Sequence, residues 1–173
     1  MTARISLIFI IIIFSSNVSS TNIRELDFQT IINNNINISL IYDKINKDQI
    51  IHKDKFKNEE LILQTELARI DKLNLILDPS ELDKEINKYN QQLGKFNNKI
   101  EEFNLHYEKQ INSLKNIIIN LILEELKKYS EVNKIDLILD SENYILSSKA
   151  INITDIIENQ VNQKIIEFNF EKY

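Results

Sequence analysis

The chain has 173 residues, a formal net charge of −5, a single glycine, a single proline and no cysteine. Without cysteine it can form neither a disulfide nor a thiol-based catalytic site, and one glycine cannot build a phosphate-binding loop. Because glycine and proline are the main turn formers, the chain can reverse direction only a few times. The composition therefore predicts a few long elements, mostly helical, rather than a compact domain with many connections.

Residues 1–20 have the pattern of a secretory signal peptide. Arg4 precedes an apolar run over 5–14. Val18 and Ser20 occupy the third and the first position before a predicted cleavage after Ser20, the two positions that a signal peptidase recognises. The run is too short for a membrane anchor, which is the alternative, because a spanning helix needs ~20 residues. A lipoprotein is excluded because no cysteine can carry the lipid. After cleavage the mature chain would hold 20 basic and 26 acidic residues, a net charge of −6.

Two series of apolar residues predict a long helical hairpin over residues 35–121. From Leu82 to Leu121, apolar residues recur at alternating spacings of four and three, the pattern of a helix that packs along a coiled-coil seam. The same spacing runs from Ile38 to Leu77, although polar residues interrupt it more often. The sequence therefore predicts two long helices packed side by side.

The residues between the two series, 78–81, predict a tight turn at the tip of the hairpin. Asp78 can cap the second helix, and Pro79 suits its first position. So short a connection makes the helices antiparallel neighbours, in which facing residues have numbers that add to 159. In this register Gln49 faces Gln110, and such a paired amide layer would define the register at some cost in stability.

The first helix also carries apolar residues outside its seam, whereas the second carries only Leu105 between Leu82 and Tyr107. Surplus apolar surface on an extended hairpin is expected to contact another molecule. The alternative is that these are scattered, exposed Ile and Leu side chains in a chain rich in both. The candidate partner-binding residues are Ile50, Ile51, Leu61, Ile62, Leu67, Leu75 and Ile76.

The remaining residues, 21–34 and 122–173, are predicted to form a small body with β-strands, so the fold class is α+β and mostly α. Strands are expected at about 23–28, 135–139 and 144–147, the last two joined as a β-hairpin, with a final helix at about 153–168. Three short strands are marginally stable alone and favour pairing with other sheets. The candidate residues of the body and its assembly are Ile135, Leu137, Leu139, Tyr144 and Ile157.

The body also contains short motifs that resemble those of a known family. They are LDFQ at 26–29, IDLILD at 135–140, Tyr144, and INITDII at 151–157. In their order along the chain, they are similar to motifs of the Skp (OmpH-like) periplasmic chaperones. The resemblance implies a homotrimer whose strands form the body and whose hairpins project around a cavity. It also implies a periplasmic, ATP-independent and non-enzymatic holdase of unfolded outer-membrane proteins (its clients), with no cofactor and no membrane anchor after signal cleavage.

The charge of the chain departs from that of the family's better-known members, which are strongly basic. An acidic chain without a basic stripe argues against nucleic-acid binding and favours apolar contacts with clients. Arg24 and Glu25 also stand inside a strand that the family usually keeps more apolar. A metal site is not expected, because His52 and His106 lie near one level of the hairpin without a clear third ligand. The competing hypothesis is a structural or tethering coiled-coil protein of the cell envelope with no client role.

Overall fold

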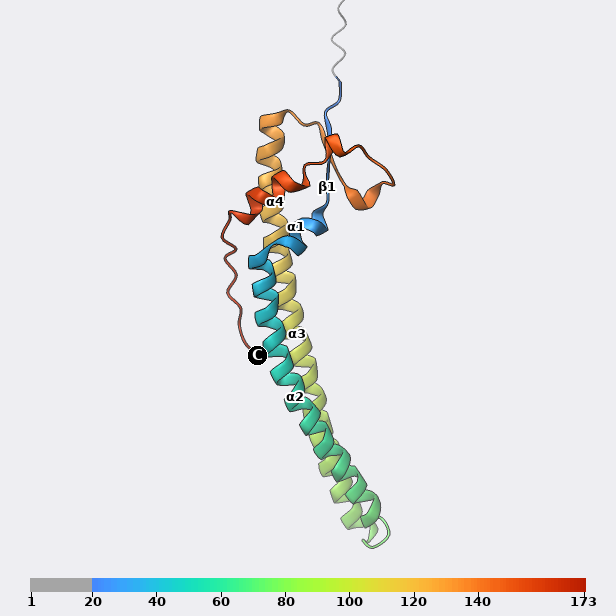
Figure 1. The fold of residues 1–173 in the computed structure, drawn as a ribbon. Coiled ribbons are helices and arrows are strands. Elements are labelled where there is room, and N and C mark those ends of the chain that lie inside the picture. The colour runs from blue at the N-terminus through green and yellow to red at the C-terminus, as the bar shows by residue number, and fades with distance from the viewer. Residues whose placement is uncertain (1–19) are drawn as a thin grey trace, which may run out of the picture.

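Two helices of unequal length form an extended hairpin that carries a small body at one end (Figure 1). The computed structural model describes residues 20–173, so the predicted signal peptide lies outside the described residues except for Ser20. Helix α2 spans Ile36–Leu73 and helix α3 spans Pro79–Asn133, which are 38 and 55 residues respectively. The longer α3 continues past its partner into the body, where it ends with Lys134 in a left-handed conformation at φ 52°.

The turn at the tip of the hairpin lies earlier in the chain than predicted. Helix α2 ends at Leu73, and the turn occupies residues 74–78 rather than 78–81. Asp78 caps α3 as predicted, accepting N–H bonds of 2.9 and 3.0 Å from the first turn of the helix, which opens with Pro79. Because this cap starts α3 immediately after Asp78, the chain must reverse before it.

The seam between α2 and α3 has the predicted register. The rings of Phe56 and Phe103, a pair whose numbers add to 159, lie 5.1 Å apart in an edge-to-face arrangement. Leu63 and Phe96, the predicted pair nearer the tip, line one groove between the two helices. The seam is most deeply buried toward the body, where Leu114 has no exposed surface. Aromatic pairs of this geometry contribute ~0.5–1.5 kcal/mol beyond the area they bury, so Phe56 and Phe103 help to hold the register.

The buried polar contact of the seam differs from the predicted amide layer. Gln49 and Gln110 are only half-buried, and among residues 20–173 no hydrogen bond joins them. Instead the buried carboxylate of Asp48 accepts a hydrogen bond of 2.5 Å from the hydroxyl of Tyr107. The prediction was wrong because a tyrosine side chain is long enough to reach about one helical turn beyond its own layer, where a carboxylate is the stronger acceptor.

The body contains a two-stranded parallel sheet instead of the predicted β-hairpin. Strand β1 (Ile23–Leu26) pairs in parallel with strand β2 (Leu137–Asp140). On its other edge, β1 accepts a 2.9 Å bond at the carbonyl of Glu25 from the N–H of Ile153. The predicted strand at 144–147 does not form, because these residues carry the chain from the β2 edge to the opposite edge of β1.

Four short elements complete the body. They are helix α1 (Phe28–Asn34), the 3-10 turns η1 (Ser141–Asn143) and η2 (Lys149–Ile151), and helix α4 (Thr154–Asn162). Helix α4 packs against both α1 and α3. One continuous core forms at this junction, and its most deeply buried side chains are Ile31, Ile38, Ile45, Leu114, Ile118, Ile122, Ile157 and Val161. Because hairpin and body share this core, each stabilises the other.

The chain after α4 is extended, although the sequence predicted a helix as far as residue 168. Residues 163–173, here called the tail segment, leave the body and run back beside the hairpin (Figure 1). Ile166, Phe168 and Phe170 pack against the core, while the residues between them are exposed. This alternation has the period of an extended chain, because a helix would not place three such side chains on one face.

Candidate functional site

The seven apolar residues predicted to bind a partner are all exposed, but they do not form one stripe. Their exposed fractions run from 43% for Leu67 to 87% for Leu75. The heptad positions of Ile50, Ile51 and Leu61 place them on the face of α2 that points away from the seam. The full set is Ile50, Ile51, Leu61, Ile62, Leu67, Leu75 and Ile76, of which the last two belong to the tip turn instead of α2. The arm therefore offers several small apolar patches rather than one.

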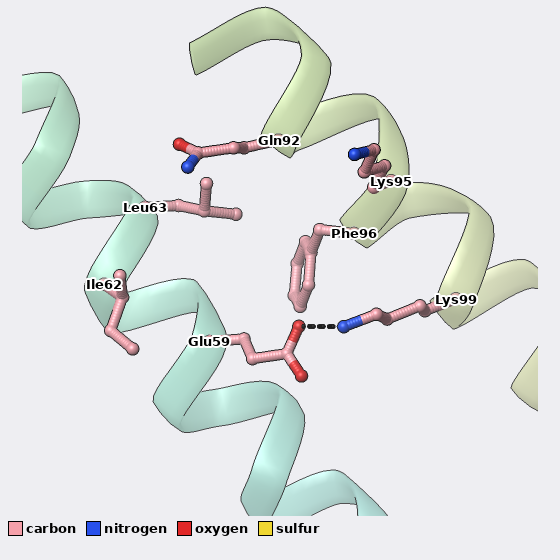
Figure 2. Close-up of a pocket in the computed structure, with 7 residues that line it drawn as sticks. All are labelled: Glu59, Ile62, Leu63, Gln92, Lys95, Phe96 and Lys99. Atoms are coloured by element: carbon pink, nitrogen blue, oxygen red, sulfur yellow. Dashed lines mark hydrogen bonds and ion pairs between the residues drawn. The ribbon is translucent and has the colours of Figure 1, made fainter. Parts of the chain in front are cut away.

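A groove of about 250 Å³ lies between α2 and α3 along the arm. Figure 2 shows the side chains of Leu63 and Phe96 pointing into it from opposite helices, with Ile62 on the adjoining surface of α2. The ammonium group of Lys99 and the carboxylate of Glu59 form an ion pair of 2.8 Å across one end. An open groove with an apolar floor and a charged rim suits one or two apolar side chains of a partner, while the charges stay in water.

Close to the tip, Arg69 of α2 connects the two helices. Its guanidinium lies 2.8 Å from the carboxylate of Glu66 on the same helix and also pairs with Glu85 on α3. Hydrogen bonding from Arg69 lowers the pKa of Glu66, although desolvation opposes the shift. Hydrogen bonds to Glu66 and Glu85 raise the pKa of Arg69. The cluster joins the two helices near the tip of the hairpin.

The outer face of β2 and the segment after it expose apolar side chains on the body. Leu137 and Leu139 are exposed, whereas Ile138 between them packs against the core. Ile145 and Leu146, in the segment predicted as a strand, are 104% and 90% exposed. Exposed apolar side chains next to a two-stranded sheet are typical of a surface that another chain covers.

The other three predicted body residues act within the chain. Ile157 has no exposed surface and belongs to the core. Ile135 is half-buried, and its N–H donates a bond of 3.0 Å to the carbonyl of Ser130, which closes the end of α3. Tyr144 is half-buried and directs its hydroxyl to β1. Ile157 is therefore a core residue, and an assembly surface does not include it.

Glu25, in the middle of β1, organises a cluster that was not predicted from the sequence. Its carboxylate accepts bonds of 2.5 Å from the hydroxyl of Tyr144 and 2.7 Å from the side-chain amide of Asn152. Hydrogen bonds from Ser147 and Tyr144 lower the pKa of Glu25, desolvation opposes them, and Asn152 lowers it further. The sequence feature that could have predicted this cluster is a carboxylate inside a strand, because a buried carboxylate needs hydrogen-bond donors around it. The cluster brings together the motif residues around 26, 144 and 152.

The two histidines both lie next to the ring of Tyr173 in the tail segment. The ring centroids of His52 and His106 are 5.2 and 5.6 Å from that of Tyr173. Within residues 20–173, no group of three or more His, Asp and Glu side chains is placed to hold a metal ion. None of the helices in the same range combines the length and the apolar character needed to cross a membrane. The ring distances make the histidines part of an aromatic contact, which was not predicted from the sequence.

No protein-family model matches the chain, and no curated protein matches it in sequence. A crystal structure from Caulobacter crescentus does match it in backbone, and that protein is described as a "putative outer membrane chaperone (OmpH-like)". The TM-score is 0.71, and the match covers 89% of this chain and 91% of the other at 12% sequence identity. The chain has the OmpH-like fold. The OmpH-like match covers arm and body together, which confirms the fold class expected from the seam and the body motifs.

Proposed function

We propose that this chain is an ATP-independent holdase of the Skp (OmpH-like) type, which keeps unfolded outer-membrane proteins from aggregating. The observation that carries the proposal is an OmpH-like fold whose arm exposes apolar side chains on α2, in the groove and at the tip. Holding a client without ATP requires apolar surface that is exposed in the free protein and is covered reversibly. The patches on the arm meet this requirement.

The division of the apolar surface into small patches favours reversible binding. Fully burying one Leu or Ile side chain contributes ~1.5–3 kcal/mol, and ordering a flexible client offsets part of this. A client therefore needs several patches at once to be held, while each single contact is weak enough to exchange. Release then follows when the client gains a better place to bury its apolar segments.

The proposal includes assembly into a homotrimer through the body. The exposed side chains of Leu137, Leu139, Ile145 and Leu146 support it, because a sheet of two short strands is marginal alone. Three arms around a shared cavity would let one client contact several patches. This multivalency raises the overall affinity without a new contact.

The proposal also includes export to the periplasm. The pattern of residues 1–20 supports cleavage after Ser20, and a mature chain without cysteine has no thiol to oxidise there. Fractionation of the cells and sequencing of the mature N-terminus would test both points. Recovery of the uncleaved chain in the cytoplasm would contradict them.

Aggregation of an unfolded client tests the holdase function. A urea-unfolded outer-membrane β-barrel protein is diluted into buffer with increasing molar ratios of the chain, and light scattering is followed without ATP. We expect scattering to fall as the ratio rises, and a folded helical protein of similar mass serves as the control. If scattering does not change at any ratio, the holdase proposal is rejected, and a structural or tethering role in the envelope takes its place.

A further inference from the structure

The tail segment lies on the hairpin as an extended strand that contacts it through every second side chain. Ile166, Phe168 and Phe170 face inward, whereas Ile165 is 85% exposed. In Figure 1 the end of the segment, marked C, lies beside the hairpin and well away from the body. The surface underneath is therefore shaped for an extended chain with apolar side chains at alternate positions.

Tyr173 anchors the far end of the tail segment between α2 and α3. Its ring centroid lies 5.2 Å from that of His52 on α2, and 5.5 and 5.6 Å from those of Phe103 and His106 on α3. Its hydroxyl donates a bond of 3.0 Å to the backbone carbonyl of Lys99. Edge-to-face contacts of this kind stabilise an aromatic pair beyond the area that it buries. At this position the hairpin therefore favours an aromatic side chain.

Side chains of the hairpin, rather than a β-ladder, hold the backbone of the tail segment. The N–H of Tyr173 donates a bond of 3.2 Å to the carboxylate of Asp48, and Nε2 of His106 lies 2.8 Å from the carbonyl oxygen of Glu171. Residues 165–173 make no backbone-to-backbone hydrogen bond in the described structure. Since every residue but proline has both backbone groups, these two contacts would accept another extended segment.

The hairpin keeps its own contacts when the tail segment leaves. Asp48 retains the hydroxyl of Tyr107 as its partner, and the rings of Phe103 and Tyr107, 4.8 Å apart, belong to the seam. None of the inward side chains of the tail segment is fully buried, and residues 165–173 make no backbone-to-backbone hydrogen bond in the described structure, so the segment can open locally while the hairpin stays folded. Exchange of the tail segment for another chain therefore disturbs little of the hairpin.

We propose that the surface beneath the tail segment is a binding site for an extended segment of an unfolded protein with alternating apolar side chains and an aromatic ring, and that the tail segment competes for this site. The identity of the second occupant rests on the holdase function proposed above. The site itself rests on the alternation of Ile166, Phe168 and Phe170, the aromatic contacts of Tyr173, and the backbone contacts to Asp48 and His106. Binding of a client at this site would then require release of the tail segment, which lowers the apparent affinity of the site in the resting protein.

Two variants of the full chain separate the inward and outward sides of the tail segment. The release variant carries Phe168→Ser, Phe170→Ser and Tyr173→Ser, which remove inward anchors. The matched control carries Ile165→Ser, Glu167→Ser and Asn169→Ser, which change exposed residues. Circular dichroism melts check that the hairpin is folded in both, and Tyr173→Ser alone replaces the release variant if that variant melts below the assay temperature.

A labelled peptide probes the site directly. It has the sequence of residues 163–173, and a second peptide of the same composition has its apolar residues grouped together. We expect fluorescence polarisation to show the release variant binding the first peptide at least ten-fold more tightly than the unmodified chain or the control. The grouped peptide should bind more weakly, because its side chains cannot reach alternate positions. Equal binding by all three proteins, or of both peptides, overturns the proposal.

The same proteins, tested against the urea-unfolded β-barrel protein, distinguish this inference from the holdase function. We expect the release variant to suppress aggregation at a lower molar ratio than the control does. If both suppress it equally, competition by the tail segment is refuted while the holdase function stands. If neither suppresses it and the release variant still gains peptide binding, the holdase function fails and the site stands as a peptide-binding surface.

Discussion

Asp48 and Tyr107 make the buried polar contact between the two helices, and the contact changes the pKa of both. Desolvation raises the pKa of Asp48, but hydrogen bonds from Tyr107 and from the backbone of Tyr173, with the charges of His52 and Lys172, bring it below its usual value. Desolvation and the bond to Asp48 raise the pKa of Tyr107. A carboxyl group with a lowered pKa in the folded state adds stability at neutral pH, and this stability is lost as the pH falls through the folded pKa.

Removal of the carboxylate measures this contact. We expect Asp48→Ala to lower the free energy of unfolding by ~1–3 kcal/mol at pH 7, because the buried hydroxyl of Tyr107 loses its acceptor. The difference from the unmodified chain should shrink as the pH falls from about 4, the unfolded pKa, through the lower folded pKa. Urea denaturation followed by circular dichroism measures both effects. The control Asp43→Ala, at an exposed position of α2, should change stability by no more than ~0.5 kcal/mol, and an equal loss there would contradict the assignment.

Among the elements, the seam between α2 and α3 contains two polar residues that form no hydrogen bond with each other in the described structure. Gln49 and Gln110 are half-buried and make no bond to each other in the described structure, so we expect Gln49→Leu with Gln110→Leu to stabilise the hairpin by ~1 kcal/mol through added apolar burial. A rise in melting temperature measures this. Gln91→Leu, at an exposed position outside the seam, should leave the melting temperature unchanged. A fall in the double variant would show that the amides have partners in the assembled protein.

The patches on the first helix and the tip are predicted to hold clients. We expect Ile51→Ser, Ile62→Ser and Ile76→Ser together to raise at least three-fold the molar ratio needed to suppress client aggregation, because each loses an exposed apolar contact. A matched triple on α3 replaces Leu105, Ile119 and Leu123, which are also exposed, with Ser. Both triples should melt as the unmodified chain does. Equal holding by the two triples would show that the patches on α2 and the tip have no special role.

The elements also show which features the sequence could predict. The seam was predictable because its spacing repeats over many helical turns. The pairing of Phe56 with Phe103 therefore followed from the sequence without any knowledge of the body. The pairing partner of β2 was not predictable, because β2 pairs with β1 instead of the neighbouring segment, and 114 residues separate Ile23 from its partner Leu137. The contact of Asp48 was missed because its heptad position beside the seam is usually solvated, and only the length of the Tyr107 side chain brings the two together.

The tail segment was missed for a different reason. Ile153, Ile157 and Val161 follow helical spacing, and Ile165 continues it, so a helix was predicted through that residue. The structure ends α4 at Asn162, and Ile165 is exposed. The alternation that begins at residue 166 was visible in the sequence but too short to outweigh the helical pattern before it. The position of the tail segment, and with it the proposed binding site beneath it, therefore required the structure.

For the whole molecule, the body is the part on which assembly should depend. We expect the unmodified chain to be a trimer at micromolar concentration, and Ile145→Glu with Leu146→Glu to shift it toward the monomer, because charges cannot be buried at a subunit contact without partners. Size-exclusion chromatography with light scattering measures the mass. Val132→Glu, at an exposed apolar position near the end of α3, is the control and should remain a trimer. A monomeric unmodified chain would remove the basis for a shared cavity.

Helix α3 runs unbroken from the tip to the body and ends four residues before β2. In mechanical terms α2 and α3 together form one beam, which is clamped at the body where Ile118, Ile122 and Leu126 are buried and extends ~60 Å beyond them to the tip. A sideways movement of about 5 Å at the free end then corresponds to a tilt of only about 5° at the clamp. Long helices bend by such amounts without a kink. In the proposed trimer, elastic bending of such beams, with no hinge loop, would let the arms part to admit clients of different size and press back on what they hold.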